Sequence, residues 1–200
     1  CKKKPKEGTE NGMRVITGSA RGRRLNELKG YDTRPTTDKV KEGIFSAIQF
    51  EVEGARVLDL FAGTGQLGIE ALSRGAQRAV FVDRRTDAVK LIRENLALTR
   101  LEEGAQVVCG DSMAYLNALR EKFDLIFLDP PYAVEASRVA SLVAALADRG
   151  QLEQGAVVVY EHASGSAGID GAGLPLSKSK SQGATTVDLM IADPEGIRNR

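Results

Sequence analysis

Val57-Leu-Asp-Leu-Phe-Ala-Gly-Thr-Gly65 and the Gln66-Leu-Gly68 that follows decide the fold of this 200-residue chain. A short apolar run leads into glycines and then into a helical pattern, which predicts a strand, a tight turn and a helix. Glycine permits such a turn and lets the backbone approach a ligand closely. Gly63, Gly65 and Gly68 match the spacing of the loop that binds dinucleotides. The segment therefore predicts a ligand-binding loop at the end of a buried strand; the alternative is a turn that binds no ligand.

Short apolar runs recur along the chain, and amphipathic stretches separate them. Such runs are typical of strands buried on both faces, and strand–helix alternation predicts an α/β fold with a doubly wound, mostly parallel sheet. A helix with Val40 and Ile48 on its apolar face should precede the first strand, capped by Thr36 or Thr37. Cys109 ends one of the runs and should be buried. The expected strands are residues 56–61, 79–83, 105–109, 123–128 and 156–160, with a closing hairpin over residues 174–191.

The composition excludes several classes of protein. Apolar residues make up 42% of the chain and charged residues 28%, which is typical of a globular domain and not of a disordered chain. No apolar run approaches the roughly 20 residues of a membrane-spanning helix. Two cysteines and one histidine argue against a disulfide framework and against a metal site built from imidazoles. We therefore expect a cytoplasmic protein without a metal or a membrane partner.

Charge is distributed unevenly along the chain. Residues 1–41 hold 12 Lys and Arg against 5 Asp and Glu, a net charge of +7, whereas the rest of the chain carries −6. A basic arm on a mildly acidic body predicts contact with a polyanion, and the alternative is a solubilising face. Residues 13–28 read as a small hairpin around Gly18 to Gly22. The residues expected to contact RNA phosphates are Arg14, Arg21, Arg23, Arg24 and Lys29.

Three aspartates indicate which ligand the glycine loop holds. Asp59 ends the first strand, four residues before Gly63, and would repel a pyrophosphate at the helix N-terminus. It suits the ammonium and sulfonium groups of S-adenosylmethionine instead. Asp83 ends the second strand, where a carboxylate can hold ribose hydroxyls. Asp111, next to Ser112, ends the third strand and can accept from an adenine amino group, although it could serve only as a helix N-cap.

Asp129-Pro130-Pro131-Tyr132 follows the fourth expected strand and supplies the chemistry. Proline removes N–H donors and stiffens the backbone, which leaves carbonyls free to accept. The Asp129 carboxylate and the Pro130 carbonyl can accept both hydrogens of an amino group on a planar base, and Tyr132 can stack on the base. Acceptors that favour a pyramidal nitrogen would free its lone pair to attack a sulfonium methyl. The pattern predicts methyl transfer to an exocyclic amine.

The glycine loop together with Asp129 to Tyr132 resembles the S-adenosylmethionine-dependent amino-methyltransferases, and within them the RsmD-type bacterial 16S rRNA guanine-N2 methyltransferases. The resemblance covers residues 13–192 and implies a seven-stranded Rossmann-like sheet, a basic N-terminal hairpin, and a target guanine in a partly assembled small ribosomal subunit. It also implies that Arg34 and Thr36 lie across the donor pocket. The segments that carry it are Met13–Gly18, Gly22–Leu25, Thr33–Asp38, Leu67–Gly75 and Glu161-His162.

On this reading, residues 1–12 are an extension, 13–35 the basic arm, 36–193 the methyltransferase domain and 194–200 a tail, in a monomer. Other functions stay open. The same chemistry fits adenine N6 or cytosine N4 of DNA, although no target-recognition domain is visible. A non-catalytic RNA-binding assembly factor and a nicotinamide enzyme are further alternatives. His162 is expected to be a hydrogen-bonded structural residue rather than a site residue.

Overall fold

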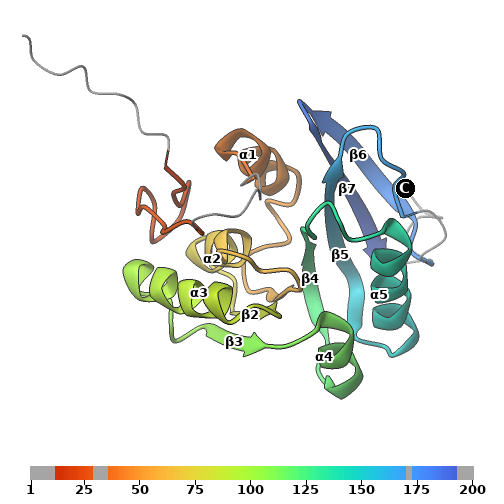
Figure 1. Ribbon diagram of the computed structural model, residues 1–200, viewed down its shortest axis with the longest axis horizontal. Helices are drawn as coiled ribbons and strands as arrows, with labels where there is room; N and C mark the ends of the chain where they lie inside the picture. The colour runs from red at the N-terminus through yellow and green to blue at the C-terminus, as the bar shows by residue number, and fades with distance from the viewer. Residues whose placement is uncertain (1–11, 29–35, 170–172, 193–200) are drawn as a thin grey trace, which may run out of the picture.

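The computed structural model describes residues 12–28, 36–169 and 173–192 (Figure 1). A single seven-stranded sheet runs in the order β3-β2-β1-β4-β5-β7-β6. β1 to β5 pair in parallel, and β7 pairs antiparallel with both β5 and β6. The doubly wound, mostly parallel sheet and the closing hairpin are as predicted. The strands are β1 (Arg56–Asp59), β2 (Arg78–Asp83), β3 (Ala105–Cys109), β4 (Phe123–Leu128), β5 (Leu152–Ala163), β6 (Leu176–Gln182) and β7 (Thr185–Ala192).

Helices cover both faces of the sheet (Figure 1). One apolar core lies under α1, α2 and α3 and includes Phe45, Ile69 and Ile92, each at most 2% exposed. A second core lies under α4 and α5 and includes Leu116 and Val143. No helix in the described ranges is long and apolar enough to cross a membrane. The helices are α1 (Asp38–Ala47), α2 (Gln66–Ser73), α3 (Thr86–Thr99), α4 (Ser112–Ala118) and α5 (Ala136–Asp148).

Two details of the strands differ from the sequence prediction. β3 is an edge strand whose residues are half-buried or exposed, so Cys109 is exposed and the prediction of a buried thiol was wrong. β5 starts before the expected residue 156, since Leu152 already pairs with Phe123 of β4. It continues through Glu161 and His162 because both pair with β7. At α1, the Thr37 side chain accepts from the Val40 N–H and is the N-cap, which leaves Thr36 for another role.

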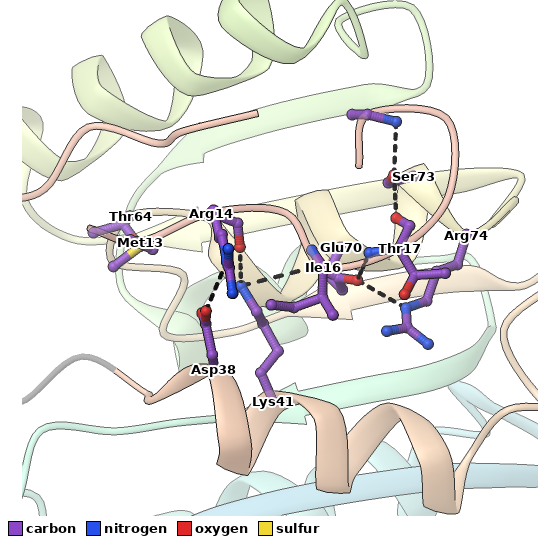
Figure 2. A network of polar contacts seen from close by, with 11 residues as sticks. Met13, Arg14, Ile16, Thr17, Asp38, Lys41, Thr64, Glu70, Ser73 and Arg74 are labelled. Carbon is purple, nitrogen blue, oxygen red and sulfur yellow. Dashed lines mark hydrogen bonds and ion pairs between the residues drawn. The ribbon is translucent and has the colours of Figure 1, made fainter. Parts of the chain in front are cut away.

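Residues 13–28 of the basic arm pack against the outer side of α2 and α3 (Figure 1). It folds back on itself through a single antiparallel bridge between Arg14 and Arg24, without regular strands. Glu70 of α2 accepts from the backbone N–H groups of Ile16 and Thr17 at 2.8 and 3.0 Å (Figure 2). Backbone amides that bind a buried carboxylate are fixed in place, so the arm is part of the folded domain rather than a loose tail.

A fully buried lysine completes this attachment. Lys41 of α1 donates from Nζ to the Arg14 carbonyl at 2.5 Å and lies 3.8 Å from the Glu70 carboxylate (Figure 2). Burial lowers the pKa of Lys41, and the Glu70 charge opposes that effect. Arg74 also binds Glu70, at 2.9 Å. The arm, α1 and α2 therefore meet at one buried charge cluster.

Candidate active site

The carboxyl ends of β1 and β4 meet at the centre of the sheet, where the strand order reverses. Chain connections leave in opposite directions at such a switch point, and ligands of open α/β sheets bind in the crevice there. Asp59, the last residue of β1, is in register with Phe127 of β4, and Asp129 follows two residues later. The structure therefore brings together the donor loop and the Asp-Pro-Pro-Tyr segment that the sequence singled out separately.

Both glycines of the loop have backbone conformations that favour glycine. Gly63 has φ +55° and Gly65 has φ +79°, in the left-handed region, and Gly65 is the N-cap of α2 without a side-chain cap. Gly68 is needed for a different reason, because a Cβ there would lie 2.3 Å from a ring carbon of Phe81 in β2. The third glycine thus permits close packing of the helix on the sheet, as in dinucleotide-binding folds.

Asp59 occupies the place where a phosphate would bind in a dinucleotide site. Its side chain is buried, and Oδ2 accepts from the Gly68 N–H in the first turn of α2 at 3.3 Å. Helix N-termini otherwise attract anionic ligands. Burial and the nearby Asp129 raise the pKa of Asp59 to about 8. A buried carboxyl with a raised pKa favours a cationic ligand, whose charge would stabilise the ionised form.

Asp83 is held by the loop that it faces. Its Oδ2 accepts from the Gly63 N–H and its Oδ1 from the Arg85 N–H, both at 2.9 Å. The Arg85 guanidinium lies 3.5 Å from the same carboxylate. These bonds orient a partly buried carboxylate at the end of β2, twenty residues after Gly63. The position agrees with the ribose-binding role that the sequence predicts, which stays a prediction.

Asp111 and Ser112 already make structural bonds. Asp111 Oδ1 accepts from the N–H groups of Met113 and Ala114 and so caps α4. Its Oδ2 binds the Arg138 guanidinium of α5 at 2.7 Å in an exposed ion pair. The buried Ser112 hydroxyl donates to the Leu60 carbonyl at 2.5 Å, which ties α4 to the end of β1. The N-cap reading of Asp111 is therefore confirmed, and its adenine-binding role stays a prediction.

The Asp-Pro-Pro-Tyr segment forms a tight loop beside Asp59. The Val134 N–H donates to the Pro131 carbonyl at 2.8 Å, and Pro130 is buried. Burial raises the pKa of Asp129 to about 6, although its side chain keeps partial access to solvent. Tyr132 is 60% exposed, which is unusual for an aromatic residue and leaves its ring free to stack. An acceptor and an exposed ring thus lie at one edge of the sheet.

Sequence reasoning missed Glu161 as a site residue. The Thr36 hydroxyl lies 3.2 Å from Asp129 Oδ2 and 3.0 Å from Glu161 Oε2, and both Thr36 and Glu161 are buried. Burial and the nearby Asp129 raise the pKa of Glu161 to about 8. The available signal was an acidic residue directly after the apolar run 156–160, because Tyr160 pairs with Leu128 and the next residue falls beside Asp129.

His162 lies apart from this cluster. It stacks on Tyr160 at a ring separation of 4.8 Å, and its Nε2 is 3.0 Å from Asp188 of β7. Its Nδ1 is 2.9 Å from the Ser166 hydroxyl. Successive residues of a strand point to opposite faces, so His162 and Glu161 face opposite sides of the sheet. The prediction of a hydrogen-bonded structural histidine is confirmed.

The arm carries exposed arginines, and α3 connects it to the donor loop. Arg14 binds Asp38 at 2.9 Å, and Arg23 donates to the Leu98 carbonyl at the end of α3. Asn95 of α3 links the arm to the loop, because it donates to the carbonyls of both Asn26 and Thr64. Arg21 and Arg24 are also exposed. Lys29, the fifth predicted RNA contact, and Arg34, which is expected to lie across the donor pocket, are outside the described residues.

In this sheet order, the N-terminus of α2 faces the Asp59 carboxylate, whereas in a dinucleotide-binding fold it would face a phosphate of the ligand. These two features define the class of Rossmann-like methyltransferases. Residues 13–191 match the family model described as conserved hypothetical protein 95, and the chain belongs to that family. It is 45% identical over 153 residues to a Bacillus subtilis (strain 168) protein provisionally named rRNA methyltransferase YlbH, covering 75% of this chain and 82% of that protein. It is 33% identical over 159 residues to ribosomal RNA small subunit methyltransferase D of Escherichia coli (strain K12), covering 80% and 79%. Among solved structures, an Escherichia coli protein provisionally described as methyltransferase yhhF superposes with a TM-score of 0.79, at 30% identity, covering 91% of this chain and 98% of that one.

Proposed function

We propose that the protein transfers a methyl group from S-adenosylmethionine to the exocyclic N2 of a guanine in bacterial small-subunit rRNA. One observation carries the choice of donor: the Asp59 carboxyl accepts from the first turn of α2, where a dinucleotide would place its pyrophosphate. The residues fit a cationic donor, because Asp129 and Asp83 are close enough for their negative charges to act on Asp59. The family and its rRNA-methylating relatives support the acceptor.

Each donor-binding residue then has a distinct task. Asp59 would neutralise the positive charge of the donor, and Gly63 and Gly65 would let the loop backbone approach it. Asp83 would hold the ribose hydroxyls and Asp111 the adenine amino group, with Ser112 fixing the helix beneath the adenine. Thr36 would close the pocket from the side of α1, and the family resemblance implies a donor-pocket role for Arg34 as well. When bound, S-adenosylmethionine supplies an electrophilic methyl group on sulfur.

The Asp-Pro-Pro-Tyr segment would hold the acceptor. The Asp129 carboxylate and the Pro130 carbonyl accept the two N–H bonds of the amine, which directs the nitrogen lone pair at the methyl group. As the N–C bond forms and the C–S bond breaks, the electron pair stays with sulfur and the nitrogen becomes positive. Asp129 stabilises that charge and accepts the proton that the nitrogen loses, before releasing it to water. Tyr132 stacks on the guanine.

The basic arm supplies the RNA contact in this proposal. Arg14, Arg21, Arg23 and Arg24 would bind phosphates, and Lys29 is proposed for the same role from the sequence. The proposal includes a monomer that needs no metal, acting on the small ribosomal subunit. Such a substrate would place the reaction in the cytoplasm. Two alternative functions from the sequence analysis stay open: an amino-methyltransferase that acts on DNA, and an RNA-binding assembly factor without catalytic activity.

A single experiment separates these functions. The protein is incubated with tritiated S-adenosylmethionine and naked 16S rRNA, small subunits or genomic DNA, followed by nucleoside analysis. We expect N2-methylguanosine from the ribosomal substrates, and an Asp129→Ala variant should lose about 10²–10³ of the single-turnover rate while donor affinity changes only a few-fold. Methylated adenine or cytosine in DNA would favour the DNA alternative. Wild-type rates for Asp129→Ala with both ligands saturating would remove Asp129 from the mechanism.

A further inference from the structure

Two carboxyl groups, one buried and one partly buried, share one hydroxyl beside the proposed acceptor site. The Thr36 Oγ1 atom lies 3.0 Å from Glu161 Oε2 and 3.2 Å from Asp129 Oδ2, and both separations are hydrogen-bond distances. Thr36 directly precedes the N-cap of α1, Glu161 lies in β5 and Asp129 follows β4. Three separate segments of the chain therefore converge on this one oxygen atom.

The number of protons shared by Thr36, Asp129 and Glu161 determines which of these contacts can be hydrogen bonds. A threonine hydroxyl donates one hydrogen bond, whereas an ionised carboxylate only accepts. If both carboxylates were ionised, one of the two contacts would be a repulsion between oxygen atoms without a proton between them. A proton on one carboxyl group lets that group donate to Oγ1 while Oγ1 donates to the other. The geometry therefore calls for a proton on at least one of the two acids.

The surroundings indicate which acid is neutral. Glu161 is the more enclosed of the two, and the Asp129 charge disfavours its ionisation, so the pKa of Glu161 rises to about 8 while that of Asp129 reaches about 6. Within the described ranges, the other charged groups on adjoining elements either are acids themselves or bind other partners. Asp59 of β1 is a further acid, Asp188 of β7 binds His162, and Lys41 of α1 binds Glu70.

We propose that Glu161 is a positioning residue: it holds the proton shared through the Thr36 hydroxyl, and it thereby fixes Asp129 as the ionised acceptor for the substrate amine. The inference rests on the proposed function for the identity of that amine. The chain Glu161–Thr36–Asp129 leaves one Asp129 oxygen bonded to Thr36 and turns the other oxygen toward the substrate. A second buried negative charge at Glu161 would compete for the only Thr36 proton and release Asp129 from this orientation.

Glutamine at position 161 provides the decisive comparison. Glu161→Gln keeps a neutral group that can donate to Thr36 but cannot ionise. Thr36→Val keeps the shape of the side chain and breaks the link. Glu153→Gln is the matched control, because Glu153 lies in the same strand and binds Arg56 at the amino ends of the parallel strands, away from the site.

The shared proton is measured first in the protein without donor or RNA. Infrared spectra should show one protonated carboxyl group fewer in Glu161→Gln than in the wild type at pH 7, and no change in Glu153→Gln. The wild-type band that Glu161→Gln lacks should disappear as the pH rises through about 8. An equal number of protonated carboxyl groups in the wild type and Glu161→Gln would overturn the assignment of the proton.

The positioning role is measured by single-turnover methyl transfer at saturating donor and RNA from pH 6.5 to 9. The wild-type rate should fall above about pH 8. Glu161→Gln should stay within about threefold of the wild type at pH 7 and lose that alkaline fall, whereas Thr36→Val should be roughly tenfold slower or more at pH 7. Protonation changes of the donor or the RNA would alter the rates of the wild type and all variants alike, so a difference between their pH profiles comes from the protein. An unchanged alkaline fall in Glu161→Gln would overturn the role. If the wild type transfers no methyl group to RNA, the proposed function fails, and the infrared result still decides where the proton lies.

Discussion

Donor binding should release a proton from Asp59. Burial and neighbouring carboxylates raise the pKa of Asp59 to about 8, so about 0.9 of the molecules hold a proton there at pH 7. A positively charged donor stabilises the ionised carboxylate and lowers that pKa. Binding at pH 7 should therefore release about 0.9 proton, and the donor dissociation constant should fall about tenfold between pH 6 and 7.

Calorimetry in buffers of different ionisation enthalpy measures this proton directly. The range from pH 6 to 7 keeps the donor's amino group charged, because α-amino groups titrate near pH 8. Asp59→Asn keeps an acceptor for the Gly68 N–H but cannot ionise, so it should bind more weakly and with little dependence on pH. Asp124→Asn is the control, since Asp124 binds Arg56 at the amino ends of β1 and β4, away from the donor loop. Tight binding by the wild type without proton release would refute the role of Asp59.

Two further predictions concern the arm. Replacing the buried Lys41 with methionine removes one of the two basic partners of the Glu70 carboxylate and leaves the Arg14 carbonyl without its donor. We expect the free energy of unfolding, measured by urea denaturation, to fall by about 3–5 kcal/mol. A decrease in the free energy of unfolding of less than about 1 kcal/mol would show that Arg74 and the backbone amides of the arm are enough to stabilise the Glu70 carboxylate without Lys41. Replacing Arg21, Arg23 and Arg24 with alanine should weaken RNA binding and reduce its salt dependence, with donor affinity nearly unchanged. An unchanged salt slope would make this face merely solubilising.

The sequence predicts the parallel half of the fold and the donor loop because both depend on local patterns. Apolar runs mark β1 to β5, and positive φ values are required where Gly63 and Gly65 stand. Asp59, Asp83 and Asp129 were found because strand ends in a parallel sheet meet at one edge. The exposure of Cys109 was missed because the sequence pattern does not show which strand becomes the edge.

The contacts across the sheet could not be predicted from one sequence. Thr36 was expected to contribute to the donor pocket or to cap a helix, yet its hydroxyl joins Asp129 and Glu161, which are 93 and 125 residues away. The buried pair of Lys41 and Glu70 likewise depends on how α1 meets α2. Such pairs look like ordinary surface charges in a helical pattern, because periodicity does not show which polar position faces another element.

The strand order also affects the time at which the site forms during synthesis. β7 lies between β5 and β6, although the ribosome makes it after both. Until residues 185–192 have left the ribosome, the edge of β5 that carries Glu161 has no partner strand, and an unpaired edge invites wrong pairing. β1 to β4, with the glycine loop and Asp129, can assemble earlier from nearer segments. The growing chain therefore acquires its donor loop first, and the environment of Glu161 is completed only when β7 pairs with β5.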